Sequence, residues 1–355
     1  MQEVKRLRQW GIALPGLPPG RLNAITDVRG VGVGHCTLVK GDSIRTGVTA
    51  VLPHFGNLFE EKVPAAVEVI NGFGKAAGLS QLQELGEIET PIILTNTLSV
   101  GAALDALVGY KLQRNPEIGR KYATVNGIVA ECNDGYLNDI RARAVEGEHV
   151  RAAIAAASRG LPREGSVGAG TGMSSFGCKG GIGTSSRLAG DYTVGVLVLS
   201  NFGLWHQLKI AGVPVGQLLP KPGEQEEKGS IVMVVATDAP LDARQLRRIA
   251  KRAGFGLARA GSVAGHGSGD FVLAFSTGSS QQEISADSLV APRMRDDKLG
   301  MLFEATVEST EEAILNALFA AGTMTGRDGN TRLALPVADV INILNNYRPV
   351  HIGEE

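Results

Sequence analysis

One serine stands where a polar segment meets an apolar run. Leu218–Gly229 reads LLPKPGEQEEKG, and its charges and prolines are typical of an exposed loop. Ser230 follows, and the next run, IVMVVATD, has the composition of a buried strand. If the Gly229–Ser230 bond were cut, Ser230 would carry a hydroxyl nucleophile and an α-amino base with a pKa of about 7.7–8.0. Gly229 would also permit the strained backbone of an N-to-O acyl shift, although a Gly-Ser pair can equally be an ordinary turn.

Other nucleophilic patterns are incomplete. The serine of GHGSGD is not a GxSxG hydrolase elbow, because His266 and Asp270 stand around Ser268 where the elbow needs glycines. Cys178 lies among glycines and could be a thiol nucleophile, but no convincing histidine accompanies it, so the sequence favours an inert cysteine. A terminal serine needs no histidine, which is compatible with the lack of a triad.

The segment Gly165–Ser186 reads GSVGAGTGMSSFGCKGGIGTSS and contains eight glycines. It is not a Walker A loop, because Gly180 follows Lys179 where that motif needs serine or threonine. It is not GxGxxG either, since Met173 takes the sixth position counted from Gly168. We interpret the segment as a tight loop where backbone passes close to backbone, or as a wall of a substrate pocket.

Composition excludes several classes of protein. There are 35 Lys and Arg against 36 Asp and Glu, so neither a basic nucleic-acid surface nor a polybasic membrane patch is expected. No apolar run approaches the ~20 residues of a membrane helix. Three cysteines without a CxxC pair favour a reducing, cytoplasmic compartment. The histidines are scattered without metal-site spacing, so we expect no metal and no cofactor.

Short β-branched runs alternate with amphipathic stretches, which predicts an α/β or α+β class. The expected strands are Val48–Leu52, Ala65–Ile70, Ile92–Thr95, Ala123–Ala130, Thr193–Leu199, Ile231–Ala236 and Phe271–Phe275. The expected helices are Gly101–Arg114, His149–Ala157, Leu241–Ala260, Thr310–Ala321 and Val337–Asn346. The fourth helix is expected to open on a capping box at Ser309–Glu312, which reads STEE.

Several blocks, in order, carry a resemblance to a known family. They read LTNTLSVG, ECNDGYLND, GAGTGM, KGGIGTSSR, VLSNFG, GSIVMVVATDAPL, GSGDFVLAFST and TMTGRDGN, and they extend from Leu94 to Asn330. The chain resembles the self-processing N-terminal-serine aminopeptidases, the L-aminopeptidase/D-esterase/amidase and β-aminopeptidase family. The resemblance implies cleavage of the Gly229–Ser230 bond and a nucleophilic role for Ser230, with the freed α-amino group as base.

The resemblance also assigns roles around that serine. Ser268 and Asp270 match a serine and an acid that would hold the terminal amine, although some members carry glutamate at the acid position. Asn201 matches the oxyanion-hole asparagine, whose amide can contribute ~2.7–4 kcal/mol to transition-state stabilisation. Tyr136 matches a tyrosine that lines the family's site; a partly buried aromatic with no catalytic part is the alternative.

Two further residues complete the predicted site. Glu131 would receive the substrate's free amino group, and a structural salt bridge is the alternative reading. Asn96 is assigned to the pocket or to the residues that support it.

The resemblance implies an αββα four-layer sandwich, similar in layers to the N-terminal nucleophile hydrolases but with different connectivity. A single domain, residues 1–355, would be processed into fragments 1–229 and 230–355, and the pairs would assemble into homotetramers. The expected activity is release of N-terminal residues from short peptides, amides or esters. An amino-acid N-acyltransferase on a related fold and a non-catalytic binding protein are the alternatives; the acyltransferases use a terminal threonine, which counts against the first.

Overall fold

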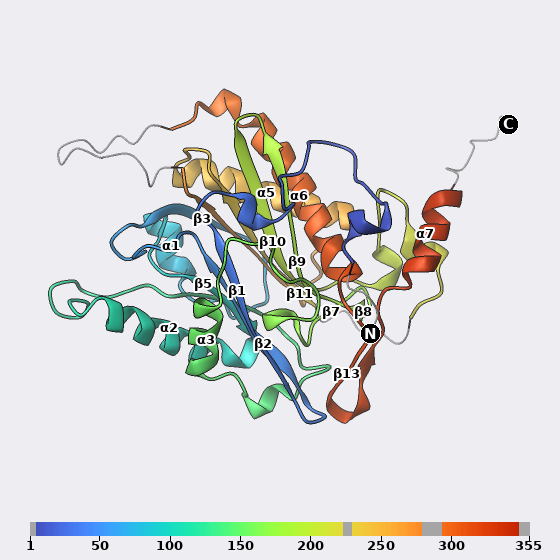
Figure 1. Ribbon diagram of the computed structural model, residues 1–355, viewed down its shortest axis with the longest axis horizontal. Coiled ribbons are helices and arrows are strands. Elements are labelled where there is room, and N and C mark those ends of the chain that lie inside the picture. The colour runs from blue at the N-terminus through green and yellow to red at the C-terminus, as the bar shows by residue number, and fades with distance from the viewer. Residues whose placement is uncertain (1–4, 223–228, 279–292, 348–355) are drawn as a thin grey trace.

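Two β-sheets lie face to face between two layers of helices (Figure 1). The computed structural model describes residues 5–222, 229–278 and 293–347. The first sheet has the strand order β1-β2-β5-β6. Its strands are β1 Gly32–Lys40, β2 Ile44–Leu52, β5 Ile92–Asn96 and β6 Ile128–Cys132. Strands β5 and β6 run parallel, so their carboxyl ends meet at one edge of the sheet.

The second sheet has the order β4-β3-β12-β11-β10-β9. Its strands are β3 Val63–Gly72, β4 Glu87–Ile88, β9 Gly181–Ala189, β10 Tyr192–Asn201, β11 Ser230–Thr237 and β12 Gly269–Ser276. Strand β11 is central, antiparallel to β10 and parallel to β12. The amino ends of β11 and β12 therefore lie beside the carboxyl end of β10.

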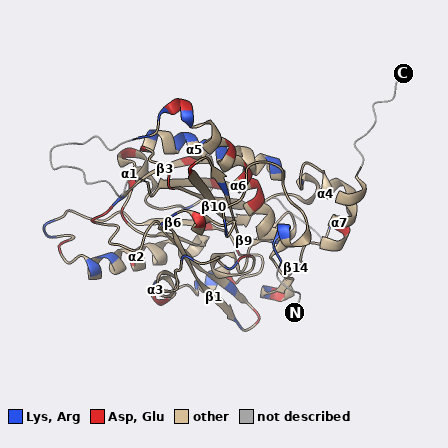
Figure 2. Ribbon diagram, turned by 45° about the horizontal axis from the view of Figure 1, so that its top comes forward, with Lys and Arg blue, Asp and Glu red and all other residues tan. Residues whose placement is uncertain are grey.

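Helices cover the outer faces of both sheets. Helices α2 Val100–Arg114 and α3 Gly147–Ala155 pack on the first sheet, and α5 Ala243–Ala260 and α6 Gly300–Phe319 pack on the second. The remaining helices are α1 Leu79–Leu85, α4 Val215–Leu218 and α7 Val337–Asn346. Two short hairpins, β7 Ser174–Ser175 with β8 Cys178–Lys179 and β13 Met324–Thr325 with β14 Thr331–Arg332, and several short 3-10 helices are also described. Most charged residues lie on helices and loops rather than along the strands (Figure 2).

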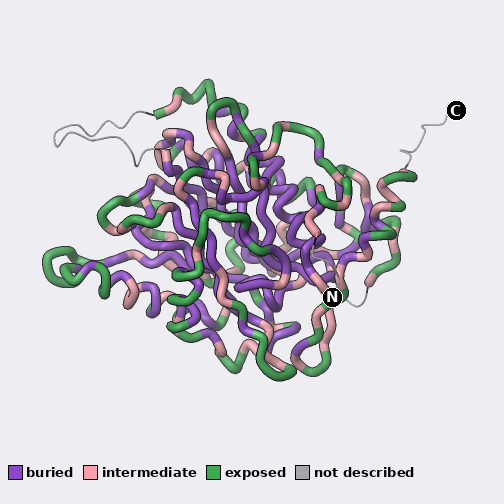
Figure 3. The backbone as a smooth tube through the Cα atoms, in the orientation of Figure 1, coloured by how far each residue is buried: buried purple, intermediate pink, exposed green. Residues whose placement is uncertain are grey.

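Three apolar cores separate the four layers, and strand alternation assigns side chains to them. In β11, Ile231, Met233 and Val235 belong to the core beneath α5 and α6. The intervening residues Val232, Val234 and Ala236 belong to the core between the sheets. A third core joins α2 and α3 to the first sheet. Because both faces of β11 are covered, its sequence is a continuous apolar run (Figure 3).

The four-layer αββα arrangement confirms the predicted fold. Most predicted strands overlap observed ones, and α7 has the predicted bounds. The prediction for Ala123–Ala130 was wrong in its bounds, since β6 is Ile128–Cys132. Strands β1 and β9 were not predicted.

Helix α6 corrects the prediction for Thr310–Ala321. It begins at Gly300, so Ser309–Glu312 lies inside it and is not a capping box. The helix also lies very close to β9, because a Cβ at Gly183 would be 2.0 Å from the carbonyl oxygen of Ala313. The residues from Ala305 onward are buried, so the sequence of this helix lacks the one-sided apolar pattern that is typical of a surface helix. Its start was therefore hard to locate from the sequence.

The glycine-rich segment is the close-packed turn that its composition predicts, although it also contains short strands. A Cβ at Gly181 would lie 2.0 Å from the carbonyl oxygen of Gly165, and one at Gly170 would lie 2.5 Å from the nitrogen of Ile182. Backbone thus passes against backbone here. The segment also holds β7, β8 and the start of β9.

Candidate active site

The carboxyl end of β10 and the amino end of β11 bring two predicted site residues together. Asn201 is the last residue of β10 and Ser230 is the first residue of β11, and the two are cross-strand partners. Ser230 shares its face of β11 with Val232 and Val234, which point between the sheets. Directly paired residues lie on the same face of a sheet, so both side chains enter the space between the sheets.

Ser230 is placed to act as a nucleophile. Its side chain is nearly buried, with 7% of the residue exposed, and its Oγ accepts a hydrogen bond of 3.1 Å from the backbone N–H of Gly269. An N–H donor aimed at an oxygen favours negative charge on that oxygen. The contact therefore favours the charge that develops on Oγ when its proton is removed.

Gly229, on the other side of the predicted cleavage bond, is held tightly against β10. A Cβ at this position would lie 2.4 Å from the carbonyl oxygen of Asn201 and 2.4 Å from the Cα of Phe202. Its φ lies outside the left-handed region, so glycine is needed here because of the close approach and not because of an unusual backbone angle.

Ser268 and Asp270 form a hydrogen-bonded pair beside Ser230. The Ser268 hydroxyl donates to Oδ1 of Asp270 at 2.6 Å, and both residues are buried. Asp270 also pairs with Ile231 in the parallel ladder between β11 and β12. A hydroxyl and a carboxylate therefore lie next to the backbone nitrogen end of β11, where a terminal amine of Ser230 would be.

The side-chain amide of Asn201 has a defined orientation. Its Oδ1 accepts from the backbone N–H of Ser174 at 2.8 Å, and its Nδ2 donates to the carbonyl of Asn133 at 3.0 Å. These two bonds distinguish the oxygen from the nitrogen of the amide. The amide is thus held in one orientation at the strand position opposite Ser230.

Glu131 reaches the same region from the other sheet. It is buried near the end of β6, its Oε1 accepts from the backbone N–H of Lys75 at 2.9 Å, and its Oε2 accepts from the hydroxyl of Thr97. A Cβ at Gly74 would lie 3.3 Å from Oε1 of Glu131 and 2.4 Å from Phe271, so the loop after β3 connects this carboxylate to β12. The salt-bridge alternative has no support among the described contacts of Glu131.

Asn96 contacts the loops around the site rather than Ser230 itself. Its Oδ1 accepts from the backbone N–H of Ser99 and caps a short 3-10 turn, while its Nδ2 donates to Oγ1 of Thr46. Asp134 is buried beside it, and burial raises the pKa of that carboxyl to about 7, opposed by hydrogen bonds from Thr46, Asn138 and Asn96. No described hydrogen bond joins Asn96 to Ser230 or Asn201, so it supports the loops rather than the nucleophile.

Tyr136 is the most exposed of the predicted residues, at 39%. Its ring packs against the guanidinium of Arg332, whose Cζ lies 3.6 Å from the ring centroid. The loop that carries Tyr136 is joined to the site, because the carbonyl of Asn133 in this loop accepts a hydrogen bond from Nδ2 of Asn201.

Two groups in the glycine-rich segment have strongly shifted pKa values. Burial raises the pKa of the Cys178 thiol to about 12, which leaves almost no thiolate at neutral pH and agrees with an inert cysteine. Burial lowers the pKa of Lys179 to about 7, and its Nζ donates to the carbonyls of Gly170 and Gly180. Neither group has a described hydrogen bond to Ser230.

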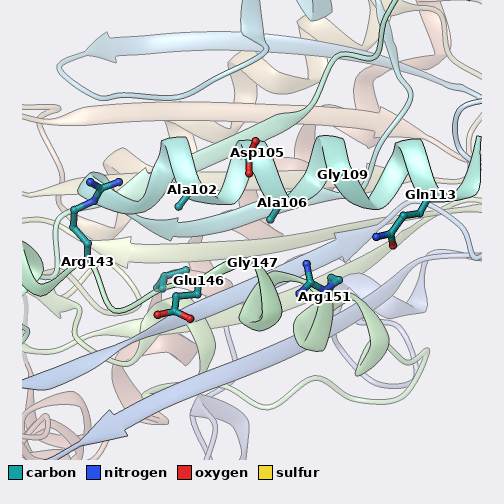
Figure 4. Close-up of a pocket in the computed structure, with 10 residues that line it drawn as sticks. Ala102, Asp105, Ala106, Gly109, Gln113, Arg143, Glu146, Gly147 and Arg151 are labelled. Carbon is teal, nitrogen blue, oxygen red and sulfur yellow. The ribbon is translucent and has the colours of Figure 1, made fainter. Parts of the chain in front are cut away.

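A groove of about 460 Å³ lies elsewhere, between α2 and α3 (Figure 4). Its charged lining residues are Asp105, Arg143, Glu146 and Arg151, and none of the predicted site residues borders it. Within the described ranges, no three His, Cys, Asp or Glu side chains are grouped so that they could bind a metal ion. In the same ranges, no helix combines the length and apolarity needed to cross a membrane.

Sequence reasoning missed residues that hold the site in place. Asn71 donates from Nδ2 to the Ser268 carbonyl at 2.5 Å and so fixes the turn before β12. Ser174 and Asn133 orient Asn201 through backbone groups, and Gly269 contacts the nucleophile through its N–H. Asn133 and Gly269 lie inside the blocks ECNDGYLND and GSGDFVLAFST, but a backbone donor or acceptor has no signature in residue type.

Comparisons with known proteins identify the family of this chain. The model of peptidase family S58 matches residues 23–332. The β-peptidyl aminopeptidase BapA of Sphingosinicella microcystinivorans is 42% identical over 98% of this chain and 93% of its own length. The PH0078 protein of Pyrococcus horikoshii OT3 is 50% identical with a TM-score of 0.92, over 97% of this chain and 99% of that one.

A further solved structure carries the fold assignment. The L-aminopeptidase D-Ala-esterase/amidase of Ochrobactrum anthropi, described as a prototype of the serine aminopeptidases and a variant of the Ntn-hydrolase fold, is 37% identical. It superposes with a TM-score of 0.88 over 96% of this chain and 98% of its own. With a family model matched over most of its length and relatives alike from end to end, the chain belongs to peptidase family S58 and is a peptidase.

Proposed function

We propose that this peptidase is a self-processing serine aminopeptidase/amidase in which Ser230 is both the site of self-cleavage and the nucleophile. The observation that carries the proposal is the junction of β10 and β11. There, the Ser230 hydroxyl accepts from the Gly269 N–H, and its cross-strand partner is the oriented amide of Asn201. The hydroxyl thus accepts one backbone hydrogen bond and lies at the strand position opposite a side-chain amide, and acyl transfer can use donors of both kinds.

In the self-cleavage step, Oγ of Ser230 attacks the carbonyl carbon of Gly229 and the C–N bond of that peptide breaks. The product is an ester between Gly229 and the Ser230 hydroxyl, and the nitrogen of Ser230 takes the proton that Oγ lost. Water then hydrolyses the ester, which leaves a carboxylate on Gly229 and a free α-amine on Ser230. The close packing of Gly229 on Asn201 and Phe202 holds that carbonyl near β10 and supports this step.

In the proposed catalytic cycle, the α-amine of Ser230 takes the hydroxyl proton while Oγ attacks the acyl carbon of the substrate. The negative charge on the substrate oxygen is stabilised by the Nδ2 donor of Asn201, with the phenol of Tyr136 as a second donor. The proton passes to the leaving amine or alcohol, and water hydrolyses the acyl-enzyme. Ser268 and Asp270 would hold the terminal amine by hydrogen bonds.

The substrates we propose are short peptides, amides or esters with a free amino group near the scissile bond. The buried carboxylate of Glu131, linked through Gly74 to β12, would bind that group as an ammonium. The names of the relatives support this class, since one is a β-peptidyl aminopeptidase and one an L-aminopeptidase D-Ala-esterase/amidase. Asn96 supports the pocket through the 3-10 turn that it caps.

We further propose that residues 1–355 form one domain that cleavage divides into fragments 1–229 and 230–355. These stay together because β11 and β12, which the second fragment supplies, lie between β10 and β3 of the first fragment. Assembly of the processed pairs into homotetramers and a cytoplasmic location are part of the proposal. The described cysteines are all free thiols, which favours a reducing compartment.

The test is the denatured mass of freshly purified protein and of Ser230→Ala, with Ser80→Ala as a control at an exposed serine of α1. We expect fragments of roughly 24 and 13 kDa, apportioned by residue number, from the wild type and the control. Ser230→Ala should remain a single chain of 37.2 kDa.

Release of p-nitroaniline from amino-acid p-nitroanilides measures the second half of the proposal. Acetyl-ornithine with glutamate, offered in parallel, measures acyl transfer instead. A wild-type chain that stays at 37.2 kDa after prolonged incubation would contradict self-processing. Processed protein that releases no amine from any amide or ester would contradict the hydrolytic activity.

A further inference from the structure

The β13–β14 hairpin has no part in the chemistry proposed above. It is formed by Met324–Arg332, which contains most of the block TMTGRDGN. The hairpin belongs to the proposed second fragment, whereas Tyr136, Ser174 and Asn201 belong to the first. Its contacts with Tyr136 and Ser174 therefore join the two fragments.

Three contacts attach this hairpin to the loop that carries Tyr136. The side-chain amide of Asn330 donates to the Tyr136 carbonyl at 2.9 Å, and the backbone N–H of Arg327 donates to the Leu137 carbonyl at 2.8 Å. A Cβ at Gly326 would lie 2.0 Å from that same Leu137 oxygen. The two backbones are thus in direct contact, and the Tyr136 loop has a fixed support.

Arg332, the last residue of the hairpin, contacts two residues of the site at once. Its guanidinium carbon lies 3.6 Å from the centre of the Tyr136 ring, and its Nε donates to Oγ of Ser174 at 3.1 Å. The backbone N–H of Ser174 in turn donates to Oδ1 of Asn201 at 2.8 Å. One side chain therefore connects the ring of Tyr136 to the strand that orients the Asn201 amide.

The Ser174 side of this connection is rigid. The hydroxyl of Ser175 is 2.7 Å from that of Ser200, and the N–H of Phe176 donates to the carbonyl of Phe202 at 2.8 Å. The rings of Phe176 and Phe202 also pack edge to face, with centroids 4.9 Å apart. A displacement of Ser174 would therefore be transmitted to the end of β10, where Asn201 lies.

We propose that Arg332 is a positioning residue of the active site, which holds Tyr136 by stacking and holds the Asn201 amide through Ser174. The role rests on the proposed function, because it assumes that Tyr136 and Asn201 stabilise the transition state. Arginine suits the task, since its planar guanidinium can cover an aromatic face and donate from its edge at the same time. Lysine has the charge but neither the plane nor the fork.

A positioning role predicts a loss in turnover and not in substrate binding. Arg332→Met should lower kcat by roughly 10- to 100-fold, the loss of one oriented donor, and leave KM within about threefold. Arg332→Lys should recover only a small part of the loss. The matched control is Arg327→Met in the same hairpin, whose side chain pairs with exposed Asp328 and contacts no site residue; its kcat should be that of the wild type.

Chemical rescue separates positioning from a general structural role. Guanidinium or methylguanidinium at millimolar concentration should raise the kcat of Arg332→Ala several-fold and leave Arg327→Ala unchanged, because only the first variant has a vacant place for the cation between Tyr136 and Ser174. Each variant is first checked for processing by denatured mass and for folding by thermal unfolding.

The possible outcomes are distinct. A wild-type protein that neither processes nor releases amines removes the proposed function itself. An active wild type with Arg332→Met at unchanged kcat, or with kcat lost but no rescue of Arg332→Ala, overturns the positioning role of Arg332. If the Met and Ala variants do not fold, Arg332→Lys decides: wild-type kcat in that variant would overturn the proposal.

Discussion

Two buried polar clusters lie on the second sheet, and they are built differently. The first joins β9 to α6: Arg187 contacts Glu312 at 2.6 Å and Glu308 at 3.1 Å, and Arg8 binds Glu312 through two nitrogens at 2.7 and 2.9 Å. Here each charge is paired. Burial alone would raise the pKa of Glu312, but the hydrogen bonds and charges of Arg8 and Arg187 hold it below its usual value.

The second cluster lies at the junction of β10, β11 and β12. Its polar groups are mainly hydroxyls and amides: Ser230 accepts one hydrogen bond from a backbone N–H, and Asn201 accepts from one backbone N–H and donates to one backbone carbonyl. Burial of polar residues therefore does not by itself mark a catalytic site. A cluster of paired charges stabilises the packing of a helix on a sheet, whereas oriented neutral donors around one hydroxyl can act on a substrate.

The largest expected effect is a loss of stability when a charge is removed from the ion-pair cluster between β9 and α6. Glu312→Gln removes the charge shared by Arg8 and Arg187, and loss of one partner from a buried pair costs about 3–5 kcal/mol of stability. Urea unfolding should show this loss, while kcat of the folded protein stays unchanged. Glu304→Gln, at an exposed position on the same helix, is the control and should differ little from the wild type. A stability loss below about 1 kcal/mol in Glu312→Gln would show that these pairs contribute little net stability.

The next effect compares two buried asparagines with the same bonding pattern. Asn316 accepts from the Leu7 N–H at 3.0 Å and donates to the Thr184 carbonyl at 2.8 Å, much as Asn201 accepts from Ser174 and donates to Asn133. Asn201→Ala should lower kcat by about 10²–10³, equivalent to ~2.7–4 kcal/mol. Asn316→Ala should lower the midpoint of thermal unfolding and leave kcat intact. Similar losses of kcat in both variants would abolish the distinction between the clusters.

The smallest effect concerns pH. Burial lowers the pKa of Lys179 from 10.5 to about 7, so between these values the unfolded chain holds a proton that the folded chain has released. The free energy of unfolding should therefore rise with pH across this window, by at most ~1.4 kcal/mol per pH unit. Lys111, whose pKa burial lowers to about 8, and Asp134 and Glu164, whose pKa values burial raises to about 7, also titrate between pH 7 and pH 9. The contribution of Lys179 is therefore the difference between the wild type and a variant that lacks this lysine.

Lys179→Met should show a smaller rise than the wild type, and Lys251→Met, at an exposed position of α5, should keep the full rise. Equal rises in Lys179→Met and in the wild type would mean that Lys179 keeps its proton in the folded protein. The ion-pair cluster should not contribute to the rise, since its arginines stay charged throughout this range.

Many of the longer strands and most of the longer helices follow from local patterns. Continuous apolar runs predict β11 and β12 because both of their faces are covered, and the one-sided apolar pattern of α5 predicts that helix. Helix α6 was predicted, but its start at Gly300 was not, because the helix is buried on all sides from Ala305 onward and carries Glu308 and Glu312 toward β9. Its acidic residues resemble a helix start in the sequence, yet their partner, Arg187, is more than a hundred residues away.

The amino-acid sequence alone places Ser230 at the junction of a polar segment and an apolar run. Its long blocks also indicate a family and a set of candidate residues. Which of these candidate residues lie together depends on the tertiary structure. Asn201 faces Ser230 through the register of two antiparallel strands, Gly269 reaches the hydroxyl through a backbone N–H, and Arg332 touches Tyr136 across the fold. Register and backbone donors depend on how distant segments pack, and no local pattern of residue types encodes them.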